Sequence, residues 1–309
     1  MQPSAVTNTT NLTASPSQFY SWNNYHCAYA VHQPTNTTPE GIPLLLIHPI
    51  GVGLSRQFWQ RFCREWYNTG QRNSIYNPDL LGCGESDMPH LAYTPSDWAE
   101  QLQYFLQTVV QKPVIVVVQG ALLPVAIELV QKESNLIAGL VLSGPPAWGL
   151  MTNKSSEWQQ KLLWNLLDSP FGSAFYRYAR TPKFLRSFST RQLFTSENSV
   201  DAEWLNTLLV GAENPASRHA VFSFLAGFWR QDYTSFIASI QQPTLAVVGE
   251  TASSISEKSK QETPDERLTH YLACLPQGRG IKINGRNVLP YESTAEFVAA
   301  IATFINEVF

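Results

Sequence analysis

Residues 114–129 read as a buried strand, a tight turn and a helix in direct succession. Residues 114–118 are an unbroken run of valine and isoleucine, which is typical of a strand covered on both faces of a parallel sheet. Gln119, Gly120 and Ala121 leave little room for a loop before a helical pattern that runs through residues 125–129. A strand that passes straight into a helix is a building unit of α/β proteins.

The same alternation runs along most of the chain and predicts a doubly wound, mostly parallel sheet with helices on both faces. Further strands are expected at residues 25–33, 44–47, 74–76, 138–143, 244–248 and near 281. Helical patterns are expected at residues 57–67 and 94–110, in a segment that ends at about residue 273, and from residue 294 to the end. Thr94 before Pro95 is the expected cap of the second of these helices.

Residues 147–240 differ from the rest, because there the pattern becomes helical and rich in aromatic side chains. We therefore predict an α/β core made of residues 19–146 and 241–309, with this helical block inserted into it. Residues 1–18 are polar, with many Thr, Asn and Ser, and have neither a basic start nor an apolar run. That composition predicts a disordered tail instead of a signal peptide.

Several segments resemble those of α/β-hydrolases in the same chain order. The strand–turn–helix around Gly120 is similar to the turn that carries the nucleophile in this family, which usually reads Gly-x-Ser-x-Gly. Four further segments also match. In chain order they are a loop after a buried strand, a glycine turn, the strand before the acid position and the segment after the histidine position. They are His48-Pro49-Ile50-Gly51, Asp79-Leu80-Leu81-Gly82-Cys83-Gly84-Glu85-Ser86, Pro243-Thr244-Leu245 through Gly249-Glu250, and Leu289-Pro290-Tyr291-Glu292.

The resemblance implies an α/β-hydrolase fold with a helical cap at 147–240, and it also indicates where a Ser-Asp-His triad would stand. The nucleophile position falls on Gly120, the acid position on Ala252 and the histidine position on Val288. None of these side chains can act as a nucleophile, an acid or a base. The sequence therefore predicts a member of the family whose active site is degenerate.

Four residues near these positions carry side chains that could replace a missing catalytic group. His48 is the candidate for remaining chemistry, although a single histidine there more often bonds to its own loop. Ser143 is interpreted as a turn hydroxyl, Cys83 as a buried thiol, and Glu250 as a carboxylate with no histidine to orient.

Binding is predicted around the same turn. Pro49 removes a backbone N–H that would otherwise help to hold an oxyanion, whereas the N–H of Ala121 remains available. Gln119 adds hydrogen-bonding capacity beside Gly120, and Tyr291 belongs to the segment that resembles the one just after the catalytic histidine. Together with His48, these residues form the predicted binding site.

Composition narrows the function further. The net charge of −3 gives no basic surface for nucleic acid or an anionic membrane. No apolar run is long enough to cross a bilayer, so we expect a cytoplasmic protein. Four scattered cysteines indicate reduced thiols, and no cofactor or metal site is expected.

Three functions stay open at this level. The chain is either a non-hydrolytic protein that binds a lipophilic small molecule in an aromatic pocket, or one that binds a protein partner through its helical block. The alternative is an active esterase- or lyase-like enzyme with a non-standard constellation around His48. Whether the protein is an enzyme is therefore not decided by its sequence.

Overall fold

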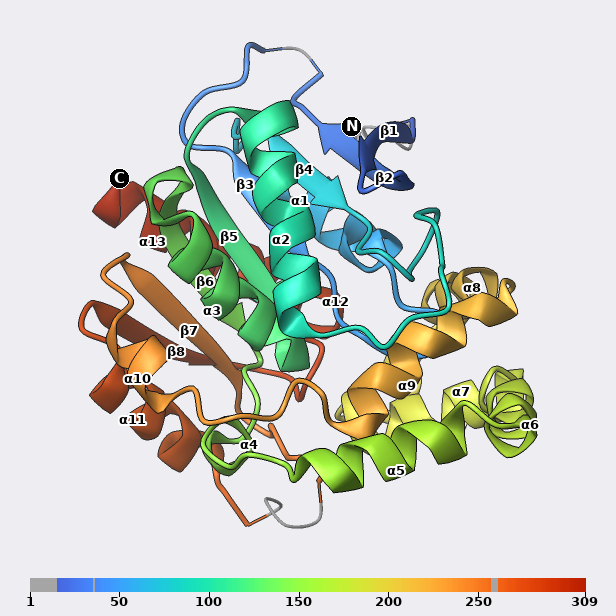
Figure 1. Cartoon of the computed structure of the whole chain (residues 1–309). Helices are drawn as coiled ribbons and strands as arrows, with labels where there is room; N and C mark the ends of the chain where they lie inside the picture. Colours follow the sequence, from blue (N-terminus) through green and yellow to red (C-terminus); the bar gives the residue numbers. More distant parts are fainter. Residues whose placement is uncertain (1–15, 36, 257–260) are drawn as a thin grey trace, which may run out of the picture.

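The computed structural model describes residues 16–35, 37–256 and 261–309. Within them, one eight-stranded sheet has the order β1-β2-β4-β3-β5-β6-β7-β8 (Figure 1). β1 and β2 pair antiparallel, as do β2 and β4, and every other neighbouring pair is parallel. The strands are β1 (Gln18–Trp22), β2 (Tyr25–His32), β3 (Leu44–Ile47), β4 (Ile75–Pro78), β5 (Val114–Gln119), β6 (Ile137–Ser143), β7 (Thr244–Gly249) and β8 (Gly278–Ile283).

Helices cover both faces of the sheet, as the sequence predicts. One face carries α2 (Pro95–Phe105), α3 (Leu123–Lys132), α10 (Thr234–Ala238) and α11 (Pro264–Cys274), and the other carries α1 (Gln60–Asn68), α12 (Leu289–Glu292) and α13 (Thr294–Val308) (Figure 1). The side chains of β5 alternate between the two cores. Val116 packs among the residues of the α2–α3 face, and Val117 packs among those of the α1–α13 face. A strand covered on both faces must be apolar throughout, which explains the valine run.

The second predicted helix begins as expected. The Thr94 hydroxyl accepts the Asp97 N–H at 3.3 Å, and the Asp97 carboxylate accepts the Thr94 N–H at 2.8 Å. This reciprocal arrangement is a capping box, which satisfies two backbone donors at the helix start. Pro95 stands in the first turn, where its missing N–H costs no hydrogen bond.

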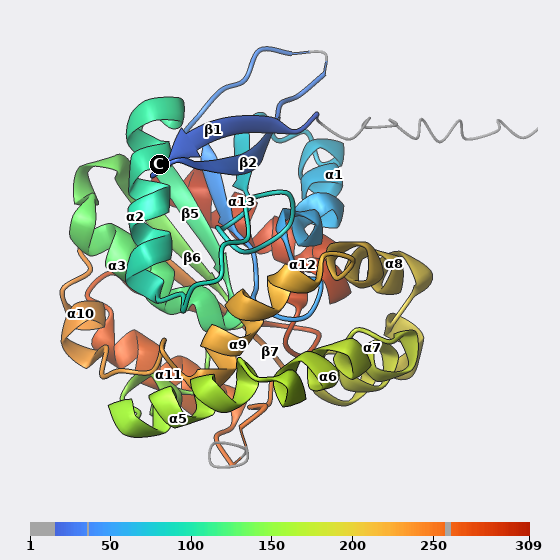
Figure 2. The same cartoon turned by 45° about the vertical axis from the view of Figure 1, so that its right-hand side comes forward.

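The remaining helices lie between β6 and β7. They are α4 (Trp148–Met151), α5 (Glu157–Leu167), α6 (Pro170–Ala179), α7 (Pro182–Phe188), α8 (Ala202–Gly211) and α9 (Arg218–Ala226), followed by α10. Figure 2 shows α5 to α9 gathered beyond one end of the sheet. The Tyr93 N–H, in the loop after β4, donates to the Ser223 hydroxyl of α9 at 2.8 Å. These inserted helices therefore lie over the carboxyl ends of the parallel strands.

Some local features differ from the sequence-based expectations. The predicted tail lies mostly outside the described residues, and its last residue, Gln18, begins β1, a strand that the sequence did not indicate.

All four cysteines are free thiols, of which Cys274 is partly exposed and the other three are buried. No helix among the described residues is both long and apolar enough to cross a membrane.

Candidate functional site

Gly120 forms the sharp turn between β5 and α3. Its φ of +61° is left-handed, a conformation that glycine adopts at little cost. A short 3-10 turn (Gly120–Leu122) connects directly to α3. Apart from its chain neighbours, a β-carbon at Gly120 would meet no atom within 4 Å. The backbone turn and the space for a side chain are thus present, and a reactive group is not.

An uncharged hydrogen-bond network occupies the ends of the strands beside Gly120. The Ser143 hydroxyl, at the end of β6, donates to Gln119 Oε1 at 2.7 Å. Gln119 Nε2 in turn donates to the Asn287 carbonyl oxygen at 2.7 Å. Gln119 and Ser143 are both buried. The two functional groups of Gln119 therefore join β5 to β6 and to the loop after β8.

The same network attaches the inserted helices to the core. Asn287 Nδ2 donates to the Gln192 carbonyl oxygen at 2.7 Å and to the Ser253 carbonyl oxygen at 2.9 Å. The guanidinium of Arg286 donates to the Ser253 hydroxyl at 2.7 Å and to the Arg191 carbonyl oxygen at 2.7 Å. Gln192 and Arg191 belong to a single π-helical turn after α7 (Ser189–Leu193). The loop after β8 is thus bonded both to the loop after β7 and to one segment of the insertion.

The predicted acid and histidine positions carry buried apolar side chains. Ala252 follows β7 and donates its N–H to the Gly249 carbonyl oxygen at 3.0 Å. Val288 packs in the core on the α1–α13 side of the sheet. Glu250, the nearest carboxylate in sequence to Ala252, is exposed at the end of β7.

His48 is fully buried at the end of β3, and both of its ring nitrogens have backbone partners. Nδ1 lies 2.8 Å from the Pro49 carbonyl oxygen, and Nε2 accepts the Leu80 N–H at 3.1 Å. This pairing requires the neutral ring with its proton on Nδ1. Burial lowers the pKa of His48, against the opposing effect of Asp79, and so favours the same neutral form. His48 therefore holds the loop after β3 against the loop after β4.

Tyr291 lies in a different cluster from the one around Gly120. Its hydroxyl accepts a hydrogen bond from Arg61 Nη2 at 2.9 Å and donates to Asp201 Oδ1 at 3.0 Å. Its ring packs edge-on against Trp204 of α8. Of the predicted binding residues, Gln119, Gly120 and Ala121 thus lie together in one turn. Pro49 is buried beside His48. Tyr291 lies apart from them, in the contact between α8 and the core.

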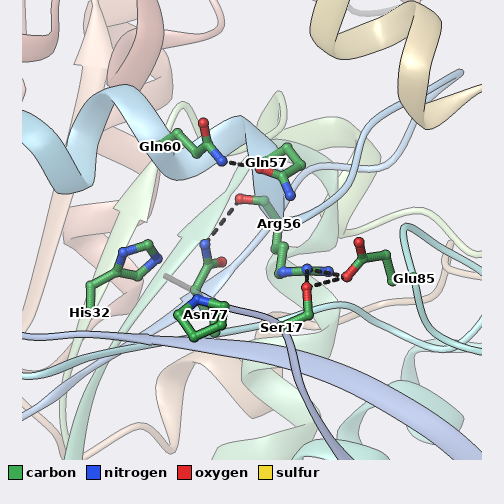
Figure 3. A pocket seen from close by; sticks show the side chains of 9 residues that line it. Ser17, His32, Arg56, Gln57, Gln60, Asn77 and Glu85 are labelled. Carbon is green, nitrogen blue, oxygen red and sulfur yellow. Dashed lines mark hydrogen bonds and ion pairs between the residues drawn. The ribbon is translucent and has the colours of Figure 1, made fainter. Parts of the chain in front are cut away.

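Asp79 fixes the glycine turn that follows β4. Its carboxylate accepts the N–H of Arg56 at 2.8 Å and that of Glu85 at 2.9 Å, and it forms a buried ion pair with the Arg56 guanidinium. Figure 3 shows Arg56 also reaching Glu85 and Ser17. The side chains of Arg56, Glu85 and Ser17 line a polar cleft of about 310 Å³. A second cleft of about 440 Å³ runs along β8 and α13, and Gly120 lines neither of them.

Sequence reasoning missed the partners of Gln119. Asn287 immediately precedes Val288, yet a motif reports only which residue replaces the histidine and not what its neighbours bond. It also missed a group of possible metal ligands among the described residues, His90, Asp168 and His219, because they are far apart in the chain.

Comparison with known proteins agrees with this architecture. A model of the alpha/beta hydrolase family matches residues 44–301. A comparison with curated protein sequences found no significant match.

Solved structures of low sequence identity have similar folds, among them an esterase, a haloalkane dehalogenase and an enol-lactonase. A thermophilic esterase from Thermogutta terrifontis has a TM-score of 0.70 and 18% identity, over 96% of this chain and 99% of the esterase. The haloalkane dehalogenase DatA from Agrobacterium tumefaciens C58 has a TM-score of 0.71 and 13% identity, over 96% and 98%. An enol-lactonase from Burkholderia xenovorans LB400 has a TM-score of 0.68 and 12% identity, over 94% and 100%. With the family match over most of its length, the chain belongs to the alpha/beta hydrolase family.

Proposed function

We propose that this protein is a non-hydrolytic member of its family that acts by binding. The observation that carries the proposal is the left-handed Gly120 at the turn, flanked by the Ser143–Gln119–Asn287 network. Nucleophilic catalysis needs an attacking group and a base within hydrogen-bond reach of it. A glycine has no attacking group, so a hydrolytic cycle cannot begin at this turn.

The hydroxyl of Ser143, which is bonded to Gln119 next to this turn, does not replace it. Ser143 is fully buried, and its hydroxyl donates a hydrogen bond to the amide oxygen of Gln119. An amide oxygen is not a base at neutral pH. His48 has a partner for each ring nitrogen, so neither nitrogen is available to take a proton from a substrate. These contacts favour a structural role for both residues over the constellation around His48.

Hydrolysis of p-nitrophenyl acetate and p-nitrophenyl palmitate by the purified protein tests this proposal. The expected rate equals that of a heat-denatured sample and is the same for Ser143→Ala and His48→Gln. Saturable turnover that either substitution abolishes would overturn the proposal and establish the alternative, an active enzyme with a non-standard site.

The exposed surface of the insertion favours a protein partner over an enclosed small molecule. Trp158, Leu162 and Leu166 recur every four residues along α5, so they share one face of the helix, and each is more than half exposed. α5 has no buried residue, and α6 adds the exposed Phe171 and Tyr178. Large exposed apolar surfaces commonly mark protein contacts.

Photo-crosslinking in cells that produce the protein tests the partner. A benzoylphenylalanine at Phe171 is expected to give discrete heavier adducts, whereas the same residue at Tyr104, an exposed site on α2, gives none. Equal adducts from both sites, or none from either, would contradict a docking role for α5 and α6. Native mass spectrometry showing a co-purified lipophilic molecule would instead favour the small-molecule function.

A further inference from the structure

Two histidines and an aspartate from three separate segments meet at one side of the inserted helices. His90 lies in the loop before α2, Asp168 directly follows α5, and His219 lies in the first turn of α9. His90 Nε2 is 2.7 Å from Asp168 Oδ1, and the rings of His90 and His219 stack with their centroids 4.3 Å apart. One potential ligand atom from each of the three residues lies within 4.8 Å of the others.

Of these three residues, His219 is the one whose ring nitrogens have no hydrogen-bond partner among the described residues. Its side chain is 4% exposed. Buried polar atoms are nearly always paired, so an unpaired imidazole facing a histidine and a carboxylate calls for an explanation. The adjacent Arg218 does not supply a partner, since its guanidinium donates to the Pro215 carbonyl oxygen at 3.0 Å.

The three groups have the chemistry of a transition-metal site. Neutral imidazole nitrogens and a carboxylate are ligands of Zn²⁺ and its neighbours, and three protein ligands leave a position for water.

The present spacing is close to that of a bound ion, but the stacked His90 ring must turn before its lone pair, which lies in the ring plane, faces the same point as that of His219. Bonds of about 2.0–2.1 Å place tetrahedral ligand atoms roughly 3.3 Å apart, closer than the 4.8 Å limit of this group. The His90 side chain is 61% exposed and stands on a loop, so it can move towards the other two.

We propose that His90, Asp168 and His219 bind a divalent transition-metal ion, with Zn²⁺ as the first candidate and water as the remaining ligand. The ion would tie α5 and α9 to the loop after β4, and so fix the insertion against the core. This proposal does not depend on the proposed function, because the three residues lie outside the Gly120 network.

Titration of Zn²⁺ into the chelator-treated, untagged full-length protein tests the site, with Co²⁺ absorption as a second readout. We expect one Zn²⁺ per chain, a rise in melting temperature, and Co²⁺ bands of a low-coordinate site. His90→Ala and Asp168→Asn each remove one ligand from an accessible position and should weaken affinity by about tenfold or more.

His26→Ala is the matched control. His26 is an exposed histidine that also faces an aspartate, with Nδ1 3.5 Å from Asp87 Oδ2. This variant should bind Zn²⁺ like the unmodified chain. The site would be overturned by an absence of binding, or by binding that His90→Ala and Asp168→Asn leave unchanged.

Discussion

At the scale of single residues, the turn after β5 separates two properties that a hydrolase needs together. Its backbone is left-handed, and the space above Gly120 is open. What it lacks is a side chain that can attack, and the positions expected for the acid and the base hold Ala252 and Val288. Gln119 uses both ends of its amide to bond the neighbouring strand and loop. The polar contacts at this place therefore connect segments of the fold.

Restoring a serine tests whether the missing nucleophile is the only deficiency. Gly120→Ser should fold, because the site has room, but it should lose about 1–2 kcal/mol of unfolding free energy to the left-handed backbone. Gly70→Ser is the matched control, with a φ of +83° and equally open surroundings. Urea denaturation should give similar losses for both, and ester hydrolysis should stay at background. Turnover gained by Gly120→Ser alone would mean that a base is present.

The Gln119 amide makes a measurable contribution to stability. Gln119→Leu leaves the Ser143 hydroxyl and the Asn287 carbonyl oxygen without this partner, so the unfolding free energy should fall by about 1–3 kcal/mol. Gln107→Leu, which changes an exposed glutamine, should alter it by about 0.5 kcal/mol or less. Equal effects of the two substitutions in urea titrations would show that the network is not a structural link.

At the scale of elements, α8 is attached to the core by charge. Arg61 of α1 contacts Asp201 and Glu203, each at 2.6 Å, and its guanidinium lies 3.8 Å above the ring of Tyr291. Burial is the largest single influence and raises the pKa of both carboxyl groups. The hydrogen bonds and charge of Arg61, together with hydrogen bonds from Trp204 and Tyr291 to Asp201 and from Arg64 to Glu203, outweigh it and leave each pKa below its ordinary value. The attachment is therefore strongest where both carboxylates are ionised.

Replacing Arg61 should weaken this attachment in a pH-dependent way. Arg61→Met should cost about 1 kcal/mol at pH 7, because the pairs are partly exposed and screened by solvent. A lowered carboxyl pKa stabilises the fold above the unfolded pKa and loses that effect as the pH falls through the folded pKa. The difference in melting temperature from the unmodified chain should thus shrink below about pH 4. A constant difference down to pH 3, or an equal loss in Arg72→Met, at a partly exposed arginine that pairs with Glu40, would contradict this.

The order of elements could be predicted from sequence because the signals are local. The apolar run of β5 and the Thr94–Pro95 cap each identify their element without knowledge of the rest of the fold. β1 could not be predicted in this way, since its Phe19 is exposed and the strand depends on pairing with β2.

The site could be predicted only in part. The motif positions located Gly120, but the orientation of Tyr291 depends on Arg61 and Trp204, which come from distant segments. The partners of Gln119 and the group around His219 depend on tertiary packing in the same way.

At the scale of the whole molecule, buried histidines connect stability to pH. Burial lowers the pKa of His32 and of His219 to about 4, and it also lowers that of His48. Between pH 6.5 and about pH 4 the unfolded chain therefore binds protons that the folded chain does not. A lowered histidine pKa makes stability fall as the pH decreases through this window.

Urea unfolding at several pH values, in the presence of a chelator, checks this dependence. The unfolding free energy should decrease from pH 7 to pH 5, and His219→Leu should make the decrease shallower. A slope that His219→Leu does not alter would show that His219 titrates alike in both states.

We propose that the protein retains the fold of a hydrolase without an activated nucleophile. A fluorophosphonate probe tests this most directly. Such a probe phosphonylates a serine hydroxyl, with loss of fluoride, only where a base has activated that hydroxyl. Intact-mass measurement of the folded protein after treatment should show an unchanged mass, as for a heat-denatured sample. A stoichiometric adduct on one serine, formed by the folded chain and lost on denaturation, would contradict the account.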